Sequence, residues 1–491
     1  MSDIRRAIFW ASASQHLSLA INFAALLVLA RLLTPAEYGI SSLGLAILAI
    51  AEAIRELAGG SFLIRERELT PEKVRSTTTV SLLVTAAVSA LLVLLADPLS
   101  SLFAVPMLAP YLVVSLLGYA LGTFLYPQQA LLGREMAFAY LAVAHMVPAV
   151  VGAFVSILLA LIGFNALSLA WAGVASTATA TVLCIAFRGD MSIYRPSLNQ
   201  WRSVIAFGAY SSVTAVLSRI ADAVPVLIFG RFLSAEALSL GHRAILLSQV
   251  PERLIQAAVG SVALPEFSRQ AREGQDLKNA YLSALSYMAA VHWPIMITLA
   301  LLAQPIVLVL LGHQWMEVAP LIRILSPALM LALPIWLQYA ALVATDGVRL
   351  LPRLLLLQTL VLAAALWLAT RYGLRAAALS ALVAMPMNAA LSILAVRSRI
   401  GFRWTELVAA LSPSAVVSAA TAAGPVVVVL ASPSDMPLTI ATAAAALGGA
   451  GWAVGLFVTG HPLWNELTRV AVAFLSLTFL RKLRSSNSIR S

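Results

Sequence analysis

The sequence predicts an all-α polytopic membrane protein with about 14 transmembrane helices, arranged as two six-helix lobes plus two C-terminal helices. Three observations predict this class. Hydrophobic residues make up 61% of the chain and charged residues only 11%, which excludes an ordinary soluble protein. Apolar runs of the roughly 20 residues needed to cross a bilayer recur along the chain, without the short alternating segments of a barrel. Finally, one stretch occurs twice.

The repeated stretch runs from Arg31 to Glu66 and again from Arg231 to Glu266. The coinciding pairs are Arg31/Arg231, Leu33/Leu233, Glu52/Glu252, Ala58/Ala258, Gly60/Gly260, Ser61/Ser261 and Glu66/Glu266. Matching charges and a Gly-Ser pair at one fixed offset indicate a duplicated membrane half. Because each half holds an even number of spans, both halves start on the same side, so the repeat is parallel and its axis lies along the membrane normal.

The apolar runs and the repeat divide the chain into four segments. We expect residues 1–190 to form the N-terminal six-helix lobe and residues 204–397 to form the second, with a polar break between them. Residues 405–460 add two spans, and residues 461–491 form a cytoplasmic tail. The tail is apolar and ends in a basic cluster, so it is predicted to be an amphipathic helix on the membrane surface, and a fifteenth span is the less favoured alternative.

The orientation follows from the distribution of basic residues. With the N-terminus inside, most Arg and Lys residues fall in inner segments, whereas the outer loops hold only Arg31, Arg231, Arg371 and Arg375. This bias predicts that both termini are cytoplasmic. It also explains the net charge of +11, because the basic residues lie in short loops without the interleaved aromatic residues of a nucleic-acid platform. No nucleic-acid partner is expected.

Catalytic and metal-binding patterns are lacking in the sequence. Cys184 is the only cysteine, so an internal disulfide and a thiolate metal site are excluded. The histidines show no metal-ligand spacing, and there is no P-loop pattern. We therefore expect no metal, no cofactor and no enzymatic activity.

Charged side chains nevertheless occur inside the predicted spans. They are Glu52, Arg55, Glu56, Arg219, Asp222, Arg243, Glu252, Arg253 and Arg323. Each costs about 2.5–3.5 kcal/mol at a helix centre, so each should face protein or water. Pairing along a helix face is one explanation, as for Arg219 with Asp222, and some could be interfacial. The alternative is a shared cavity, and every basic member is Arg, whose planar group suits phosphate oxygens.

Several segments resemble the polysaccharide transporter family, the Wzx-type flippases of lipid-linked oligosaccharides. The segments are ARLLTPAEYG at 30–39, GRFLSAEALSLG at 230–241, SQVPERLIQAAVGSVALPEFSR at 248–269 and LGHQWMEVAPLIRILSPAL at 311–329. This family belongs to the superfamily that also holds multidrug extruders and the lipid II flippase. The resemblance covers nearly the whole chain, and it implies two lobes around a cationic central cavity that opens alternately to each side.

The resemblance also implies a substrate and partners. The substrate would be an undecaprenyl-diphosphate carrying a sugar repeat unit, moved across the bacterial cytoplasmic (inner) membrane for exopolysaccharide, capsule or O-antigen synthesis. A polysaccharide polymerase and a chain-length regulator would be the protein partners. In the lipid II branch, arginines on the second and eighth spans hold the diphosphate, and Arg55 and Arg253 occupy comparable spans.

The candidate site residues fall into three groups. Candidates for the diphosphate are Arg55, Arg219, Arg243 and Arg253. Candidates for coupling to H⁺ or Na⁺ are Glu52, Glu56 and Asp222. Candidates for sugar contacts are Gln15, Asn22, Gln128, Tyr210, Gln249 and Asn388, each of which could instead bond between helices.

Three other functions remain open. A multidrug or cation antiporter should have a cavity dominated by aromatic residues and a carboxylate, which the intramembrane arginines oppose. A lipid II flippase would share the cationic cavity. A membrane glycosyltransferase or ligase would act on the same carrier, but such enzymes usually present large outer loops or an acidic catalytic motif, and the outer loops here are short.

Overall fold

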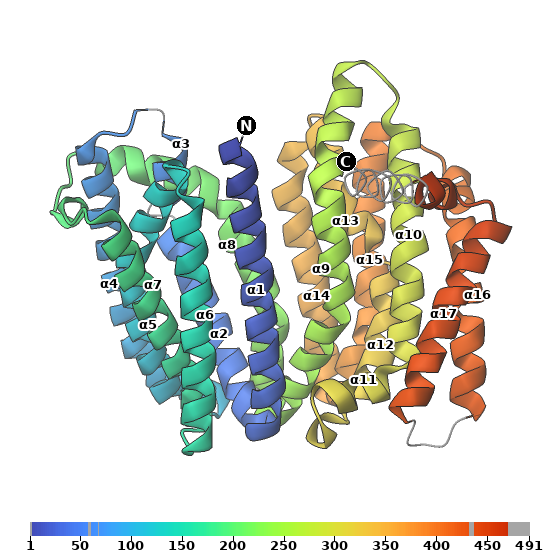
Figure 1. Cartoon of the computed structure of the whole chain (residues 1–491), viewed down its shortest axis with the longest axis horizontal. Coiled ribbons are helices and arrows are strands. Elements are labelled where there is room, and N and C mark those ends of the chain that lie inside the picture. Colours follow the sequence, from blue (N-terminus) through green and yellow to red (C-terminus); the bar gives the residue numbers. More distant parts are fainter. Residues whose placement is uncertain (1, 57–59, 67, 432–436, 470–491) are drawn as a thin grey trace, which may run out of the picture. The chain divides into compact units, whose positions relative to one another are not determined.

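The structure is a computed structural model that describes residues 2–56, 60–66, 68–431 and 437–469. Within these ranges, the side chains of residues 2–13, 60, 61, 65, 207–215, 257, 258 and 261 are not described. Every regular element of the described chain is a helix (Figure 1). The predicted all-α class is therefore confirmed.

The long helices follow the predicted order of apolar runs. They are α1 (Ser2–Leu32), α2 (Pro35–Glu56), α4 (Pro71–Phe103), α5 (Leu108–Arg134), α6 (Phe138–Leu161), α7 (Leu167–Arg188), α8 (Trp201–Phe232), α9 (Ala235–Arg272), α10 (Leu277–Leu301), α12 (Val318–Met330), α13 (Leu333–Ala344), α14 (Leu351–Ala369), α15 (Leu374–Ile400), α16 (Trp404–Ala431) and α17 (Leu438–Val458). Short helices are α3 (Gly60–Arg65) and α11 (Ala303–Leu310), with 3-10 turns η1 (Ser192–Tyr194), η2 (His313–Trp315), η3 (Val348–Leu350) and η4 (Thr370–Tyr372). Residues 462–469 of the predicted tail helix are helical, and the rest of the tail lies outside the described residues.

Twelve candidate membrane spans occur among the described residues. The segment Val318–Ala344, which contains α12 and α13, counts as one of them, and α8 and α9 are not among the twelve. The protein is thus a multi-pass membrane protein, but the predicted count of 14 spans is not confirmed.

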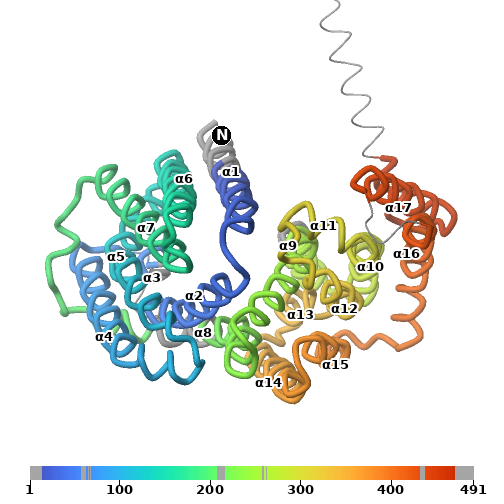
Figure 2. The backbone as a smooth tube through the Cα atoms, turned by 90° about the horizontal axis from the view of Figure 1, so that it is seen from below, coloured from blue at the N-terminus to red at the C-terminus, as the bar shows by residue number. Residues whose placement is uncertain are grey.

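The chain divides into two compact units. Unit 1 comprises Met1–Arg243, Leu310–Glu317 and Leu366–Ala377, and unit 2 comprises Ala244–Val309, Val318–Ala365 and Ala378–Ser491. In unit 1, α6 packs against α1 and α7, α5 packs against α4 and α7, and α2 packs against α8. In unit 2, α16 lies beside α10 and α17, as Figures 1 and 2 show. The predicted lobe boundaries stay a prediction.

The duplicated stretch forms the same local structure twice. Helix α1 ends at Leu32 and α2 begins at Pro35, while α8 ends at Phe232 and α9 begins at Ala235. In each copy a hydroxyl residue caps the second helix: Thr34 Oγ1 accepts from the Glu37 N–H at 3.4 Å, and Ser234 Oγ accepts from the Ala237 N–H at 3.1 Å. Because side-chain acceptors satisfy free N–H groups at helix starts, both copies encode the same helix break.

The two copies of this helix break contact each other within unit 1. A Cβ added to Gly39 would lie 1.9 Å from the Ala235 carbonyl oxygen, so only glycine permits this approach. Ser42 Oγ and His242 Nδ1 are 2.9 Å apart and hydrogen-bonded, although 200 residues separate them. Ser42 and His242 are equivalent positions of the repeat. The two helix starts that the repeat encodes therefore lie against each other within unit 1.

The polar break after α7 is ordered against unit 1. Arg75 Nε donates to the Ser192 carbonyl at 3.1 Å, and the Ser197 N–H donates to Thr79 Oγ1 at 3.0 Å. The Tyr194 hydroxyl donates to the Phe124 carbonyl at 2.7 Å. Hydrogen bonds from the Ser192 side chain and N–H hold the pKa of the Asp190 carboxyl below its usual value. This segment therefore fixes the start of α8 on α4 and α5.

Candidate functional site

Arg55 is a buried cation held in a fixed position at the end of α2. Its side chain is only 7% exposed, and its Nη1 donates to the Tyr119 carbonyl at 2.8 Å. Its Cζ lies 4.6 Å from the ring centroid of Tyr119 and 4.2 Å from that of Tyr126, in cation–π geometry. A Cβ on Gly122 would come within 2.8 Å of Nη1. Two aromatic rings and one glycine therefore orient the guanidinium.

The charge of Arg55 is only loosely neutralised. Glu52 Oε1 lies 3.9 Å from Nη2, near the outer limit of an ion pair, and the Glu52 side chain is 54% exposed. The guanidinium carries five N–H donors in a planar fork. Such a group, when its carboxylate partner is distant and solvated, retains the capacity to bind an anion.

Arg55 lines two cavities of unit 1. The larger, which we call the arginine cavity, has a volume of about 500 Å³, and its polar lining includes Glu52, Arg55, Glu56, Thr123, His145 and Arg219. The smaller, of about 380 Å³, lies along α5 and α7 and shares Glu52, Arg55 and Tyr126 with the first. The structure thus brings together two of the four predicted diphosphate residues and two of the three predicted coupling carboxylates. Arg219 and Glu56 are exposed.

The other two predicted arginines lie elsewhere. Arg243 is buried at 8% exposure, with its Cζ 3.9 Å from the ring centroid of Tyr38 and 5.6 Å from that of Trp315. The Trp315 indole donates to the Ala30 carbonyl at 2.8 Å, so this group packs against the α1–α2 helix break. Arg253 is exposed, and its Nη2 lies 3.5 Å from Gln249 Oε1 one turn away.

The remaining candidates of unit 1 are scattered. Gln15 and Asn22 are exposed on α1, and Asp222 is exposed on α8. Gln128 is fully buried, and its Nε2 donates to the Asp190 carbonyl at 3.2 Å. The side chain of Tyr210 lies outside the described residues.

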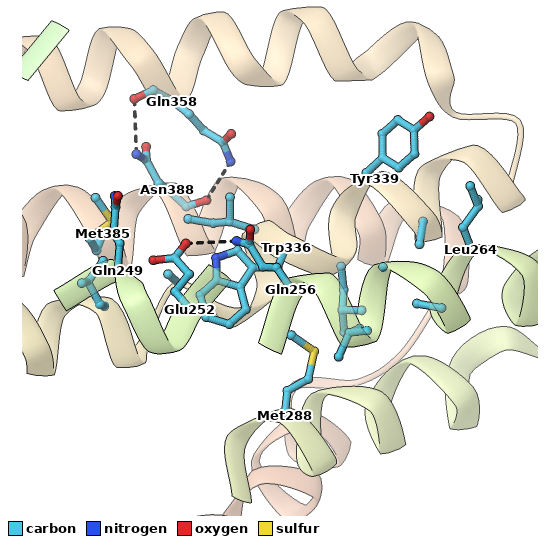
Figure 3. A pocket seen from close by; sticks show the side chains of 18 residues that line it. Gln249, Glu252, Gln256, Leu264, Met288, Trp336, Tyr339, Gln358, Met385 and Asn388 are labelled. Atoms are coloured by element: carbon cyan, nitrogen blue, oxygen red, sulfur yellow. Dashed lines mark hydrogen bonds between the residues drawn. The ribbon is translucent and has the colours of Figure 1, made fainter. Parts of the chain in front are cut away.

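Gln249 and Asn388 line a second polar site, which lies in unit 2 (Figure 3). This site, which we call the amide pocket, has a volume of about 540 Å³. Its polar and aromatic lining includes Gln249, Glu252 and Gln256 from α9, Trp336 from α13, Gln358 from α14 and Asn388 from α15. Its lining contains no Arg or Lys among the described residues.

Hydrogen bonds fix the lining of the amide pocket. Gln256 Nε2 donates to Glu252 Oε1 at 3.0 Å. Gln358 Nε2 donates to the Asn388 carbonyl and Asn388 Nδ2 donates to the Gln358 carbonyl, both at 3.3 Å (Figure 3). Trp336 is held edge-on against His292, with ring centroids 4.7 Å apart. The pocket therefore presents oriented amides, one carboxylate and an indole.

Sequence reasoning missed several of these groups. Gln256 stands at the repeat position equivalent to Glu56, so the repeat itself could have identified it. Tyr119 and Tyr126 follow Arg55 by more than sixty residues, and their contact with it depends on how α2 packs against α5. Trp336 and Gln358 are single polar or aromatic residues in apolar runs, which gives no signal before the helices are placed.

The fold is that of a known class of membrane transporters. The structure aligns with that of the lipid II flippase MurJ in its inward closed conformation with a TM-score of 0.70, covering 93% of this chain and 99% of that one at 12% identity. It aligns with an inward-facing multidrug resistance MATE transporter of the MOP superfamily with a TM-score of 0.60, covering 78% of this chain and 94% of that one at 18% identity. Identities this low establish a shared fold alone.

Residues 28–320 match the family described as polysaccharide biosynthesis protein, and the chain belongs to this family. The resemblance inferred from the sequence is thereby confirmed. Among the relatives are the succinoglycan biosynthesis transport protein ExoT of Rhizobium meliloti (strain 1021), 24% identical over 327 residues, and the lipopolysaccharide biosynthesis protein WzxC of Escherichia coli (strain K12), 20% identical over 322 residues. The matches cover 66% and 64% of this chain, and they span 65% of the length of either relative.

Proposed function

We propose that this protein is a flippase that moves an undecaprenyl-diphosphate-linked oligosaccharide repeat unit across the bacterial cytoplasmic membrane for surface polysaccharide synthesis. It acts as a transporter by alternating access and not as an enzyme. Both termini are cytoplasmic in this proposal. The family membership and the names of the relatives support the substrate class.

The observation that carries the proposal is the buried, aromatic-clamped Arg55 in a cavity that also contains Arg219. Arginine pairs with phosphate through two parallel hydrogen bonds. A diphosphate cannot cross hydrocarbon without such replacement of its water shell, because transfer of an unpaired ion into an apolar medium costs tens of kcal/mol. The prenyl chain has no such cost and can stay in the bilayer.

Glu52 and Glu56 are the proposed coupling groups, since both line the arginine cavity. Protonation or Na⁺ binding at these carboxylates would change the net charge around Arg55 during the cycle. Asp222 remains a further candidate from the sequence. A polysaccharide polymerase and a chain-length regulator are the proposed protein partners, downstream of the transported repeat unit.

The two carboxylates also favour a second candidate function, extrusion of cationic compounds. In that case Glu52 and Glu56 would hold the cationic substrate. The two candidates make opposite predictions about the charge of the transported molecule.

Transport by the purified protein in proteoliposomes tests the proposal. The assay compares a prenyl-diphosphate-linked oligosaccharide, lipid II and a cationic dye, each with wild-type protein and with Arg55→Gln. We expect transfer of the lipid-linked oligosaccharide and its loss in the variant. Transfer of the dye alone would support the second candidate, transfer of lipid II at an equal or higher rate would reassign the substrate, and sugar incorporation into the acceptor would contradict the assignment as a transporter.

A further inference from the structure

The amide pocket of unit 2 contains buried acceptors without partners. Glu252 Oε2 and Asn388 Oδ1 are both buried, and within the part of the chain that the structure describes neither accepts a hydrogen bond of good geometry, although the Trp336 indole lies close to the Glu252 carboxyl group. Asn388 is 5% exposed. Leaving a buried polar group unpaired is unfavourable, because the group loses its hydrogen bonds to water without replacement. Two such atoms in one pocket indicate that a ligand with hydrogen-bond donors completes it.

The pocket combines acceptors and donors with an aromatic ring. Glu252 and Asn388 offer free acceptor oxygens, and the side-chain amides of Gln249 and Gln256 carry both N–H and C=O groups. A sugar hydroxyl both donates and accepts, so this mixture suits a polyol. The indole of Trp336 lies beside Glu252 (Figure 3) and supplies an apolar surface next to these polar groups. The volume of about 540 Å³ lies within the range of small-molecule sites.

The same composition disfavours other occupants. A bound cation would use the oxygens and leave the amide N–H groups and the indole without a role, and the described residues contain no cluster of three His, Cys, Asp or Glu that could hold a metal ion. An anion would lie beside Glu252 with no Arg or Lys in the lining to balance it. The ligand should therefore be an uncharged polyol.

We propose that the amide pocket binds one uncharged hexose or N-acetylhexosamine residue of the oligosaccharide, and that it excludes uronic acids. This proposal rests on the proposed function, because the sugar arrives attached to the diphosphate carrier. Glu252 and Asn388 accept from sugar hydroxyl or amide N–H groups, Gln249 and Gln256 donate to sugar oxygens, and Trp336 packs against the C–H face of the ring. The pocket thus contributes to selection of the repeat unit.

Binding of free sugars to the full-length protein in nanodiscs tests the proposal, with saturation-transfer NMR as the readout. The probes are methyl glucoside, N-acetylglucosamine and glucuronate. We expect millimolar binding of one or both uncharged sugars and weaker binding of glucuronate. Glu252→Gln replaces one acceptor oxygen of the pocket with an N–H donor and should weaken sugar binding roughly tenfold or more.

Three tryptophan variants separate a sugar contact from a packing role. Trp336→Leu should abolish sugar binding, while Trp336→Phe, which keeps an aromatic face, should retain most of it. Trp404→Leu is the matched control, because Trp404 is exposed on α16 and lies outside the pocket. Thermal unfolding of each sample identifies a variant that fails to fold. If Trp336→Leu fails to fold, the sugar binding of the two single variants Trp336→Phe and Glu252→Gln tests the proposal instead.

The proposal is overturned if uncharged sugars do not bind, if they bind equally to wild type, Glu252→Gln and Trp336→Leu, or if glucuronate binds most tightly. Binding of farnesyl diphosphate to the same samples tests the proposed function separately. Intact diphosphate binding without sugar binding contradicts the amide pocket alone, and the reverse result contradicts the role of Arg55 alone.

Discussion

The arginine cavity of unit 1 and the amide pocket of unit 2 are built on the same part of the duplicated helix, yet they differ in chemistry. Glu52 and Glu252 are equivalent and line their respective sites. One turn later, Arg55 in the first copy corresponds to Ile255 in the second. Ile255 packs against the hydrophobic core of unit 2.

The difference between Arg55 and Ile255 indicates that the arginine is required for function and not for the fold. Because an isoleucine occupies the equivalent position and packs in a core, the helix does not require a cation there. Burial of an arginine costs several kcal/mol unless it is paired, so a position that tolerates isoleucine is expected to keep arginine only for another reason. We infer that the first copy supplies the anion site. The second copy, where Gln256 replaces Glu56, supplies an uncharged polar site.

The largest expected effect comes from removing the Arg55 charge. Arg55→Gln should reduce transport of the lipid-linked oligosaccharide roughly 100-fold, because a charge-assisted contact with phosphate is worth about 3 kcal/mol. The matched control is Arg253→Gln, an exposed arginine on α9 outside both sites. Restoration of surface polysaccharide in a strain lacking the protein measures both. If Arg253→Gln has the larger effect, the anion site belongs to α9 and the comparison between the two sites is wrong.

A smaller effect is expected from displacing Arg55 without changing its charge. Gly122→Ala places a Cβ 2.8 Å from Arg55 Nη1, so the guanidinium must move. The closely related Gly118→Ala, one turn earlier on α5, has its nearest atom at 3.5 Å and should fit. We expect Gly122→Ala to lower transport about tenfold, or about 1.4 kcal/mol, with unchanged amounts of protein in the membrane. Equal transport by the two variants would show that the position of Arg55 does not matter.

A stability effect is expected from the polar network behind the amide pocket. Gln358 Nε2 lies 2.8 Å from Ser392 Oγ, 3.2 Å from Gln338 Oε1 and 3.3 Å from the Asn388 carbonyl, so its two N–H groups serve three neighbouring acceptors. Gln358→Leu removes these donors from a buried position and should destabilise unit 2 by about 1–3 kcal/mol. Thermal unfolding of purified protein measures this, with the exposed neighbour Leu357→Ala as the control. An unchanged midpoint would mean that the network does not shape the pocket.

The smallest effect is expected at the exposed end of α9. The Arg269 side chain lowers the pKa of Glu266 to about 2. A lowered folded-state pKa contributes stability above the unfolded value of about 4.3, and that stability is lost only as the pH falls toward 2. Solvent screening makes even this contribution small. The free energy of unfolding of wild type and that of Glu266→Gln should therefore follow parallel curves between pH 5 and 8. A difference between the two proteins that varies with pH in this range would contradict the lowered pKa of Glu266.

Much of the fold follows from the sequence because it depends on local patterns. Length and apolarity of the runs predict helices, and the repeat predicts that one stretch of membrane helix occurs twice, 200 residues apart. The number of spans is harder to predict from the sequence. Helix α9 carries Glu252 and Arg253, and it is not among the twelve candidate spans. Charge in a helix lowers its apparent hydropathy even where the helix is long.

The sequence predicts the candidate site only in part, because residues that are adjacent in the sequence can face different surroundings in the fold. Glu52 and Arg55 are three residues apart and share a cavity. Arg253 directly follows Glu252, but only Glu252 faces the amide pocket. Arg243 looked like a binding residue by charge alone, and its contacts with Tyr38 and Trp315 come from segments more than seventy residues away on either side. Such tertiary contacts are not encoded in the spacing of charges.

The most direct test of the central claim is the affinity of the purified protein for farnesyl diphosphate in nanodiscs. Wild type, Arg55→Gln, Arg55→Lys and Arg253→Gln are compared at one salt concentration. The account predicts saturable binding by wild type and Arg253→Gln, loss of binding in Arg55→Gln, and only partial recovery in Arg55→Lys, which restores charge without the planar fork. Equal affinity of wild type and Arg55→Gln would contradict the account.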